Sequence, residues 1–277
     1  MNELLRNCMK ILPPQFYKQL NLFYLALSFF TRIPVPQTMQ YSPELLSQSN
    51  RYFSLVGLLL GAILALFYYV VGQFFGIEVS ILLIMVLSLM LTGAFHEDGL
   101  ADMADGLGGG YSTEQCLTIM KDSRIGTYGT VTLVMALALK FSLLVEIANH
   151  GVMLIVSVLL LSQSLSRAVA ASLIASLSYV SEEGNNKSKP LATTQTSKDI
   201  TILVIVGCLP LFLYGVKFIL VCLVALVIFR KFFIRFLNKK IGGFTGDCLG
   251  AAQQLAEIII LMVAVIFLNN SMLGGAV

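Results

Sequence analysis

The sequence predicts an all-α polytopic membrane protein, a bundle of about seven transmembrane helices with its active site at the cytosolic face. Of the 277 residues, 57% are apolar and only 12% are charged, whereas soluble domains average about 45–50% and about 25%. The apolar residues are gathered in runs long enough to cross a bilayer. A soluble chain of this length could not comfortably bury so many apolar runs inside one core.

Seven apolar runs are candidate spans, at residues 53–75, 78–95, 128–149, 152–179, 200–214, 217–237 and 255–268. A spanning helix needs about 20 mainly apolar residues, so the fifth and last runs are short. Gly57, Gly61 and Ala65 recur every four residues, which favours close helix contacts in lipid. Pro210 predicts a kink in the fifth run.

Polar segments separate these runs at residues 1–51, 96–127, 180–199 and 238–254. Seven crossings would put all four on one side, together with most Lys and Arg residues, and the positive-inside rule makes that side cytosolic. The N-terminus is then inside and the C-terminus outside. We expect one integral-membrane catalytic domain over residues 1–277, with a cytosolic or interfacial segment at 1–51 and a flexible loop at 180–199.

The first candidate site is an acidic segment that ends the second run. Asp98, Asp102 and Asp105 are spaced i, i+4 and i+7, so on a helix they fall within an arc of roughly 60°. Unpaired carboxylates at membrane depth cost about 2.5–3.5 kcal/mol each. A divalent cation would offset this cost, and oxygen ligands suit Mg²⁺. A solvated acidic helix end is the alternative.

A glycine run at residues 106–110 is expected to stop this helix and to expose backbone N–H groups that could face an anion. Ser112 then fits an N-cap, with Gln115 three residues later. The short helix that follows ends at Lys121 and Arg124, close enough to hold one phosphate between them. Contact with lipid headgroups is the alternative for this basic pair.

A second acidic element opens the last run. Asp247, Gly250, Gln254 and Glu257 line one stripe of a helix within roughly 80°, and acidic groups entering an apolar helix indicate a functional site. Arg167, inside the fourth run, should face the bundle interior and pair with substrate phosphate or with a carboxylate. As alternatives, Asp247 would only cap the helix and Glu257 would be structural. The side chain of Arg167 would extend to the membrane interface.

The scattered cysteines, Cys8, Cys116, Cys208, Cys222 and Cys248, form no C-x-x-C pair and indicate neither a zinc site nor a disulfide framework. The chain also lacks a dinucleotide fingerprint, a P-loop and a nucleic-acid-binding module. We therefore expect no nucleic-acid partner, while membrane lipid is an expected partner. Whether the chain forms a homo-oligomer is left open.

Five segments together resemble the cobalamin synthase family, the adenosylcobinamide-GDP ribazoletransferases. They are residues 27–36 (LSFFTRIPVP), 95–109, 121–129, Ser166 with Arg167, and 242–257. They lie in order across most of the chain. The resemblance implies an enzyme of the bacterial cytoplasmic (inner) membrane with multiple spans. Its substrates would be adenosylcobinamide-GDP and α-ribazole or its 5′-phosphate, its products GMP and adenosylcobalamin or the 5′-phosphate.

Both readings lead to one hypothesis for the site. Asp98, Asp102, Asp105 and Asp247 are the predicted catalytic and Mg²⁺-binding residues, and one of these carboxylates would accept a proton. Lys121, Arg124, Arg167 and Glu257 are the predicted substrate-binding residues. Positioning and electrostatics would carry most of the catalysis.

Three rival functions remain at this stage. A CDP-alcohol phosphotransferase acting on lipid has a similar acidic pattern, although that pattern has an Arg soon after its first Asp-Gly, where this chain has Ala101 and Asp102. A transporter would place its carboxylates in mid-span. A non-catalytic membrane scaffold would leave the acidic stripes unexplained.

Overall fold

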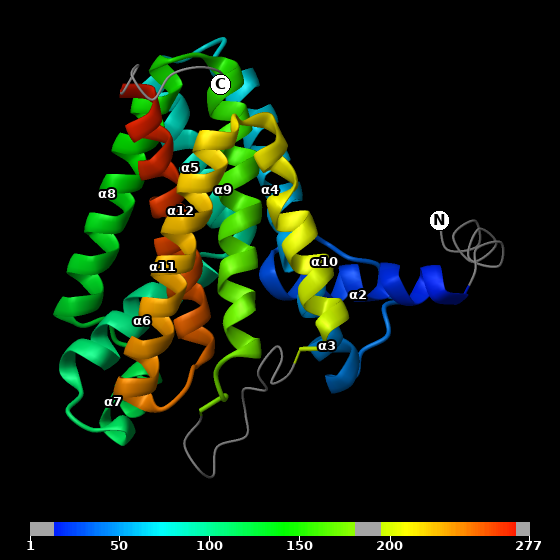
Figure 1. Cartoon of the computed structure of the whole chain (residues 1–277), viewed down its shortest axis with the longest axis vertical. Helices are drawn as coiled ribbons and strands as arrows, with labels where there is room; N and C mark the ends of the chain where they lie inside the picture. The colour runs from blue at the N-terminus through cyan, green and yellow to red at the C-terminus, as the bar shows by residue number, and fades with distance from the viewer. Residues whose placement is uncertain (1–13, 181–194, 270–277) are drawn as a thin grey trace.

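The computed structural model describes residues 14–180 and 195–269, and this part of the chain is helical without β-strands (Figure 1). In order, the elements are α2 (Pro14–Phe30), α3 (Pro43–Ser49), η1 (Asn50–Tyr52), α4 (Phe53–Val71), α5 (Ile77–Thr92), α6 (Phe95–Gly109), α7 (Thr113–Met120), α8 (Thr127–Asn149), α9 (Val152–Ser172), η2 (Leu173–Ala175), α10 (Ser197–Cys208), η3 (Leu209–Leu213), α11 (Val216–Ile241) and α12 (Gly246–Asn269). The all-α prediction is confirmed.

Four helical stretches within these residues are long and apolar enough to cross a membrane: Pro43–Val71, Thr127–Asn149, Val152–Ala175 and Gly246–Asn269. The pair α5 and α6 would add a fifth only as one span bent by 85°. The expected number of about seven is not confirmed. With 12 residues, α10 is only about 18 Å long, and α11 carries Lys217, Arg230 and Lys231 within its apolar stretch.

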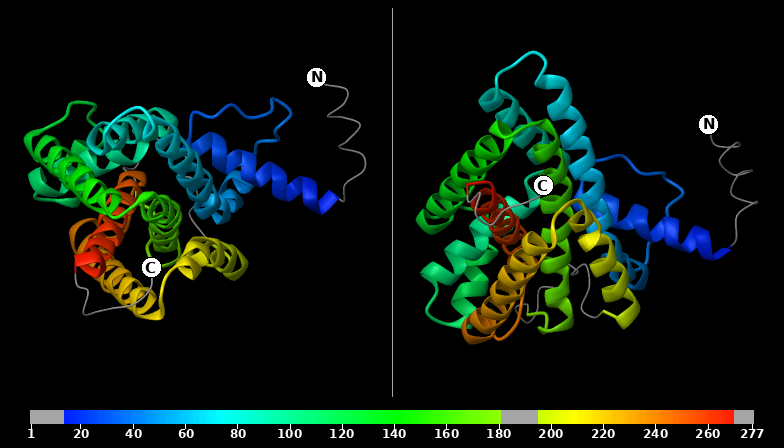
Figure 2. Two further views of the ribbon diagram at one scale, coloured as in Figure 1. Left: turned by 90° about the horizontal axis from the view of Figure 1, so that it is seen from above. Right: turned by 45° about the horizontal axis from the view of Figure 1, so that its top comes forward.

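The centre of the bundle is α9, which packs against α4, α10 and α12 (Figures 1 and 2). Its contact with α4 depends on small residues. A Cβ atom on Gly57 would collide with the backbone carbonyl oxygen of Gln163, and one on Gly61 would lie 2.7 Å from that of Leu159. The predicted small-residue contact face of the first run is therefore confirmed.

Because of a sharp turn between α5 and α6, the acidic helix α6 is not parallel to the helices of the bundle. Gly93 and Ala94 have left-handed backbone angles, with φ of 65° and 57°, and two such residues in succession end an α-helix. The guanidinium of Arg32 lies against Gly93, where a Cβ atom would be 2.5 Å from its Nε. The turn places α6 across one end of the bundle, outside the four spans.

The N-terminal helices and α10 lie to one side of this bundle, and α2 runs across the direction of α4 and α9 (Figures 1 and 2). A buried ion pair, 2.5 Å long, joins Arg51 in η1 to Asp199 in α10. Thr196 and Asp199 form a capping box at the start of α10. The last three residues of the expected loop 180–199 are thus helical, and residues 181–194 lie outside the described part.

The expected break at Pro210 is confirmed, because α10 ends at Cys208 and a 3₁₀-helix follows. The glycine run at residues 106–110 ends α6 as predicted, since the helix stops at Gly109. The N–H of Gly110 donates to the carbonyl of Gly106. That group is therefore used within the helix end and is not exposed to an anion as expected.

Candidate functional site

The candidate site lies where α6 crosses the first turns of α12. The two backbones touch at this crossing, since a Cβ atom on Gly99 would be 2.9 Å from the backbone oxygen of Asp247. On the other side of the crossing, a Cβ on Gly250 would be 3.2 Å from the oxygen of His96. Glycine at both positions lets the helices approach, and this brings two acidic segments far apart in the sequence together.

Three carboxylates lie close enough to interact at this crossing. Asp98 is exposed, while Asp102 and Asp247 are half-buried, and Thr245 Oγ1 donates a hydrogen bond of 3.3 Å to Asp247 Oδ2. Burial, followed by the nearby charges of Asp98 and Asp247, raises the pKa of Asp102 to about 7. Like charges held this close oppose ionisation, and a bound cation would remove that opposition.

Asp105 is on the same helix but has a different surrounding. It is buried, and its two carboxylate oxygens accept hydrogen bonds from the backbone N–H groups of Gly126 (2.7 Å) and Gly129 (2.8 Å). A Cβ atom on Gly129 would collide with this carboxylate. Asp105 therefore fastens the loop before α8 to α6, and this structural role was not foreseen from the sequence.

The segment that Asp105 fastens carries the predicted phosphate-binding residues. Lys121 ends α7, whose N-cap is Ser112 as predicted, with a 3.2 Å hydrogen bond from the N–H of Gln115. Arg124 is exposed and forms a 2.6 Å ion pair with Asp122. Hydrogen bonds from Arg124 lower the pKa of Asp122 to about 2, so a phosphate would compete with this carboxylate for the guanidinium.

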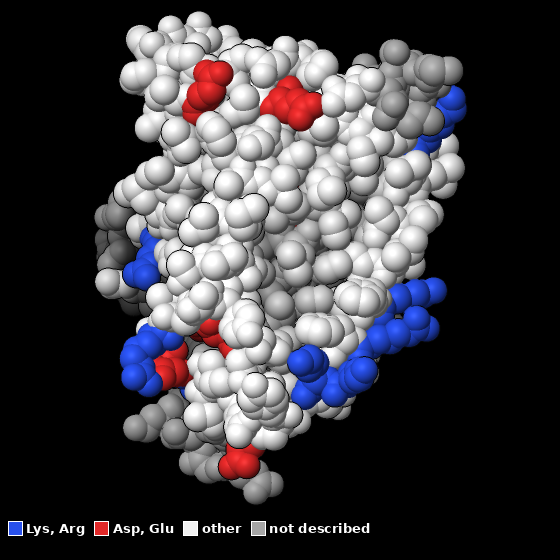
Figure 3. Space-filling model, turned by 90° about the vertical axis from the view of Figure 1, so that its left-hand side faces the viewer, with Lys and Arg blue, Asp and Glu red and all other residues white. Residues whose placement is uncertain are grey.

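Basic side chains also approach the site from α11. Lys240 Nζ donates a hydrogen bond of 3.2 Å to the carbonyl of Leu107 in α6. Figure 3 shows acidic atoms set among basic side chains at the lower end of the molecule, a largely uncharged surface in the middle, and further acidic atoms near the top. From the sequence, Lys240 counted only toward membrane orientation, because its distance from α6 along the chain conceals the contact.

Within the described residues, no three His, Cys, Asp or Glu side chains already form a metal-binding group. The four predicted carboxylates therefore do not make a closed cage here. Asp98, Asp102 and Asp247 nevertheless fit a cation that is shared with a phosphate substrate, because Mg²⁺ in such sites commonly takes one or two carboxylates and completes its shell with substrate oxygens and water. The raised pKa of Asp102 is the observation that supports this fit.

Arg167 and Glu257 do not join the acidic cluster. Arg167 is 1% exposed, its Nη1 donates to the backbone and side-chain oxygens of Gln163 (2.8 and 2.7 Å), and it lies over the ring of Phe53. Glu257 is 2% exposed and forms a 2.9 Å ion pair with Lys140. Ten residues of α12, about 15 Å of helix, separate Glu257 from Asp247. The predicted substrate-binding role of both is therefore unsupported by their position.

These two residues belong instead to a buried polar network that links α6, α8, α9 and α12. Gln163 Nε2 donates to Glu257 Oε1 (2.7 Å), and Gln254 Nε2 donates to Glu97 Oε1 (3.0 Å). Neither Lys140 nor Glu97 was predicted to belong to a site. The stripe from Gln254 to Glu257 was the available signal, but it could not identify partners on other helices.

Known proteins are similar to this chain over most of its length. The family model for cobalamin-5-phosphate synthase matches residues 22–265. An adenosylcobinamide-GDP ribazoletransferase of Vibrio cholerae is 53% identical over 255 residues, covering 92% of this chain and 97% of the relative. The Shewanella woodyi enzyme of the same name is 50% identical over 241 residues, covering 87% and 94%. No solved structure matches the chain. The chain belongs to the cobalamin-5-phosphate synthase family.

Proposed function

We propose that the chain is an adenosylcobinamide-GDP ribazoletransferase that works at the crossing of α6 and α12. The observation that carries the proposal is the juxtaposition of Asp98 and Asp102 with Asp247, beside a basic segment that Asp105 fastens in place. Such a site suits transfer at a pyrophosphate, where positioning and charge neutralisation do most of the work. The relatives' names supply the two substrates.

In this reaction a hydroxyl oxygen of α-ribazole, or of its 5′-phosphate, bonds to the cobinamide-side phosphorus of adenosylcobinamide-GDP. The bond from that phosphorus to the bridging oxygen breaks, GMP leaves, and the hydroxyl proton is released. One of the three carboxylates at the crossing is the candidate acceptor for that proton. Asp98 and Asp247 would orient the pyrophosphate only through the cation that they hold.

Mg²⁺ held by Asp98, Asp102 and Asp247 would neutralise negative charge that develops on the departing GMP. In this proposal Asp105 contributes to the site by holding the basic segment rather than by binding the cation. Lys121 and Arg124 bind phosphate oxygens, with Arg124 exchanging Asp122 for the substrate.

We further propose that this end of the molecule faces the cytosol of a bacterial inner membrane. The exposed Lys and Arg residues of α11, Lys231, Arg235, Lys239 and Lys240, lie at the end that carries the site, and Glu78 and Glu146 lie at helix ends on the other side. This charge difference follows the positive-inside rule. Lipid would cover the exposed apolar side chains of the spans.

The test is release of GMP by the purified chain in nanodiscs with adenosylcobinamide-GDP, α-ribazole and Mg²⁺. We expect turnover, its loss with a chelator, and a decrease of at least about a hundredfold in Asp98→Asn and Asp102→Asn. Glu78→Gln, a matched change in an exposed acidic residue far from the site, should keep wild-type activity. Near-normal turnover of Asp98→Asn would refute the assignment of the site.

The alternative of a CDP-alcohol phosphotransferase acting on lipid is tested in the same preparation. A CDP-activated lipid with an alcohol acceptor should yield no CMP if the proposal is right. Release of CMP without any turnover of adenosylcobinamide-GDP would favour the alternative. Family membership makes the ribazoletransferase the function that the observations support best.

A further inference from the structure

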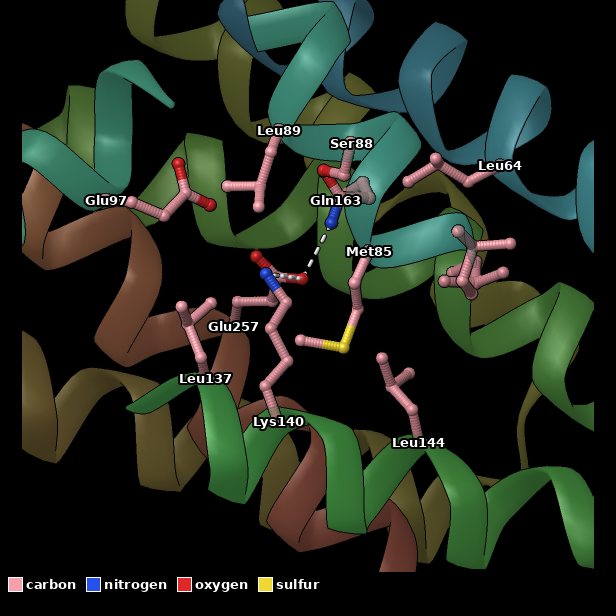
Figure 4. A pocket seen from close by; sticks show the side chains of 12 residues that line it. Leu64, Met85, Ser88, Leu89, Glu97, Leu137, Lys140, Leu144, Gln163 and Glu257 are labelled. Atoms are coloured by element: carbon pink, nitrogen blue, oxygen red, sulfur yellow. Dashed lines mark hydrogen bonds and ion pairs between the residues drawn. The ribbon is translucent and has the colours of Figure 1, made fainter. Parts of the chain in front are cut away.

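A pocket lies inside the bundle, among α4, α5, α6, α8, α9 and α12 (Figure 4). The space along its walls is about 340 Å³ when the open side is included, and its enclosed part is only about 20 Å³, roughly the room of one hydroxyl group or water molecule. Most of its wall is apolar, formed by Leu64, Ile84, Met85, Leu89, Leu137, Leu144 and Leu159, and its polar groups are Ser88, Glu97, Lys140, Gln163 and Glu257. The catalytic proposal uses none of these residues.

The pocket opens sideways, toward lipid. Its partly exposed wall residues all belong to α5 and α8: Met85, Ser88 and Leu89 on the first helix and Leu137 on the second. The wall residues from the other helices are buried. Next to the opening, the side chains of Val86 and Val134 are 51% and 58% exposed. Since α8 is a candidate span, this exposed apolar surface faces hydrocarbon and not water.

The polar end of the pocket contains an unsatisfied acceptor. Glu97 is 5% exposed, and its Oε1 accepts the hydrogen bond from Gln254. Its Oε2 is buried and has no hydrogen-bond partner among the described residues. A buried carboxylate oxygen without a donor is costly, and a molecule that enters the pocket can supply that donor.

The charges around the pocket are balanced, which limits the nature of that molecule. Glu257 pairs with Lys140 at 2.9 Å, and Arg167 is held through Gln163, the residue that also binds Glu257. With Glu97, the network contains two acidic and two basic groups. A cation or an anion would upset this balance inside a low-dielectric region, whereas a neutral group that donates a hydrogen bond would not.

We propose that the pocket is a binding site for a neutral amphiphile taken from the bilayer, such as a long-chain alcohol or primary amide. Its hydroxyl or amide group donates a hydrogen bond to Glu97 Oε2, and its hydrocarbon chain lies along the leucines of the wall and leaves between α5 and α8. Because Glu97 precedes Asp98 on α6, an occupant also steadies the helix that carries the catalytic carboxylates. The binding itself does not depend on the proposed function.

The test uses the full chain in nanodiscs and a long-chain alcohol that carries a diazirine for photocrosslinking, with labelled peptides located by mass spectrometry. We expect saturable labelling of α5 and α8 that dodecanol displaces and dodecane does not. Leu137→Trp, which fills the opening, should reduce labelling about tenfold, whereas Val134→Trp on the outer face should not. Glu97→Leu should reduce displacement by dodecanol about tenfold, since only the hydrogen bond is lost.

Three results would overturn the proposal. Labelling that rises linearly with alcohol content would show ordinary lipid contact, as would equal labelling of Leu137→Trp and Val134→Trp. Equal displacement by dodecane would show that no hydrogen-bond donor is recognised. The comparison of the two Trp variants decides the question even if Glu97→Leu does not fold, because both Trp changes lie on the partly exposed surface of α8.

Discussion

Replacement of Lys140 by Met should destabilise the protein more than most single substitutions. Lys140 Nζ lies 2.9 Å from Glu257 Oε1, and both side chains are almost fully buried. At an effective dielectric constant of about 20, the attraction over this distance is about 6 kcal/mol. The desolvation of Lys140, which the variant avoids, offsets part of it. Breaking such a pair therefore lowers the free energy of unfolding by about 3–5 kcal/mol.

A change in Glu257, the partner of Lys140, separates the loss of the ion pair from the loss of packing. In Lys140→Met alone, Glu257 remains buried with only its hydrogen bonds from Gln163 and Gln253. The double variant Lys140→Met with Glu257→Gln removes both charges, so it should recover at least about 1 kcal/mol relative to the sum of the single changes. Lys217→Met, at an exposed position in α11, is the matched control.

The assay is equilibrium unfolding by sodium dodecyl sulfate in mixed micelles. Far-ultraviolet circular dichroism is the suitable signal, because the chain has no Trp. If Lys140→Met unfolds within about 0.5 kcal/mol of the wild type, or if the two single changes add without coupling, the ion pair does not stabilise the bundle and the reasoning is wrong.

Arg51→Met should lower the free energy of unfolding by about 3–5 kcal/mol in the same titration, because it leaves the carboxylate of Asp199 buried and unpaired; no loss would show that water reaches this pair. Gly129→Ala should reduce GMP release at least about tenfold, because its Cβ atom displaces the carboxylate of Asp105 that fastens the basic segment. Gly109→Ala, whose Cβ would make only an ordinary contact, is its control, and equal activity of the two would contradict the role of Asp105.

The class of the protein and the acidic face of its candidate site could be predicted from sequence. Apolar composition required membrane spans, and the i, i+4, i+7 spacing put Asp98, Asp102 and Asp105 on one face of a helix. Local signals of this kind also identified the N-cap at Ser112 and the break at Pro210. They depend on helix geometry and on backbone chemistry within a few residues, so they need no knowledge of the rest of the fold.

The tertiary structure decided how these pieces are used. From the spacing, Asp105 was predicted to bind Mg²⁺ just as Asp98 was. Only the tertiary structure shows that its carboxylate oxygens already accept hydrogen bonds from the N–H groups of Gly126 and Gly129. Hydropathy indicated seven runs. The turn at Gly93 and Ala94, the short α10 and the charges of α11 leave four clear spans within residues 14–180 and 195–269. Glu257 forms an ion pair with Lys140 and is not part of the acidic site. The physical reason is that a periodic pattern predicts which residues share one face of a helix. Which other helix packs against that face depends on the tertiary structure.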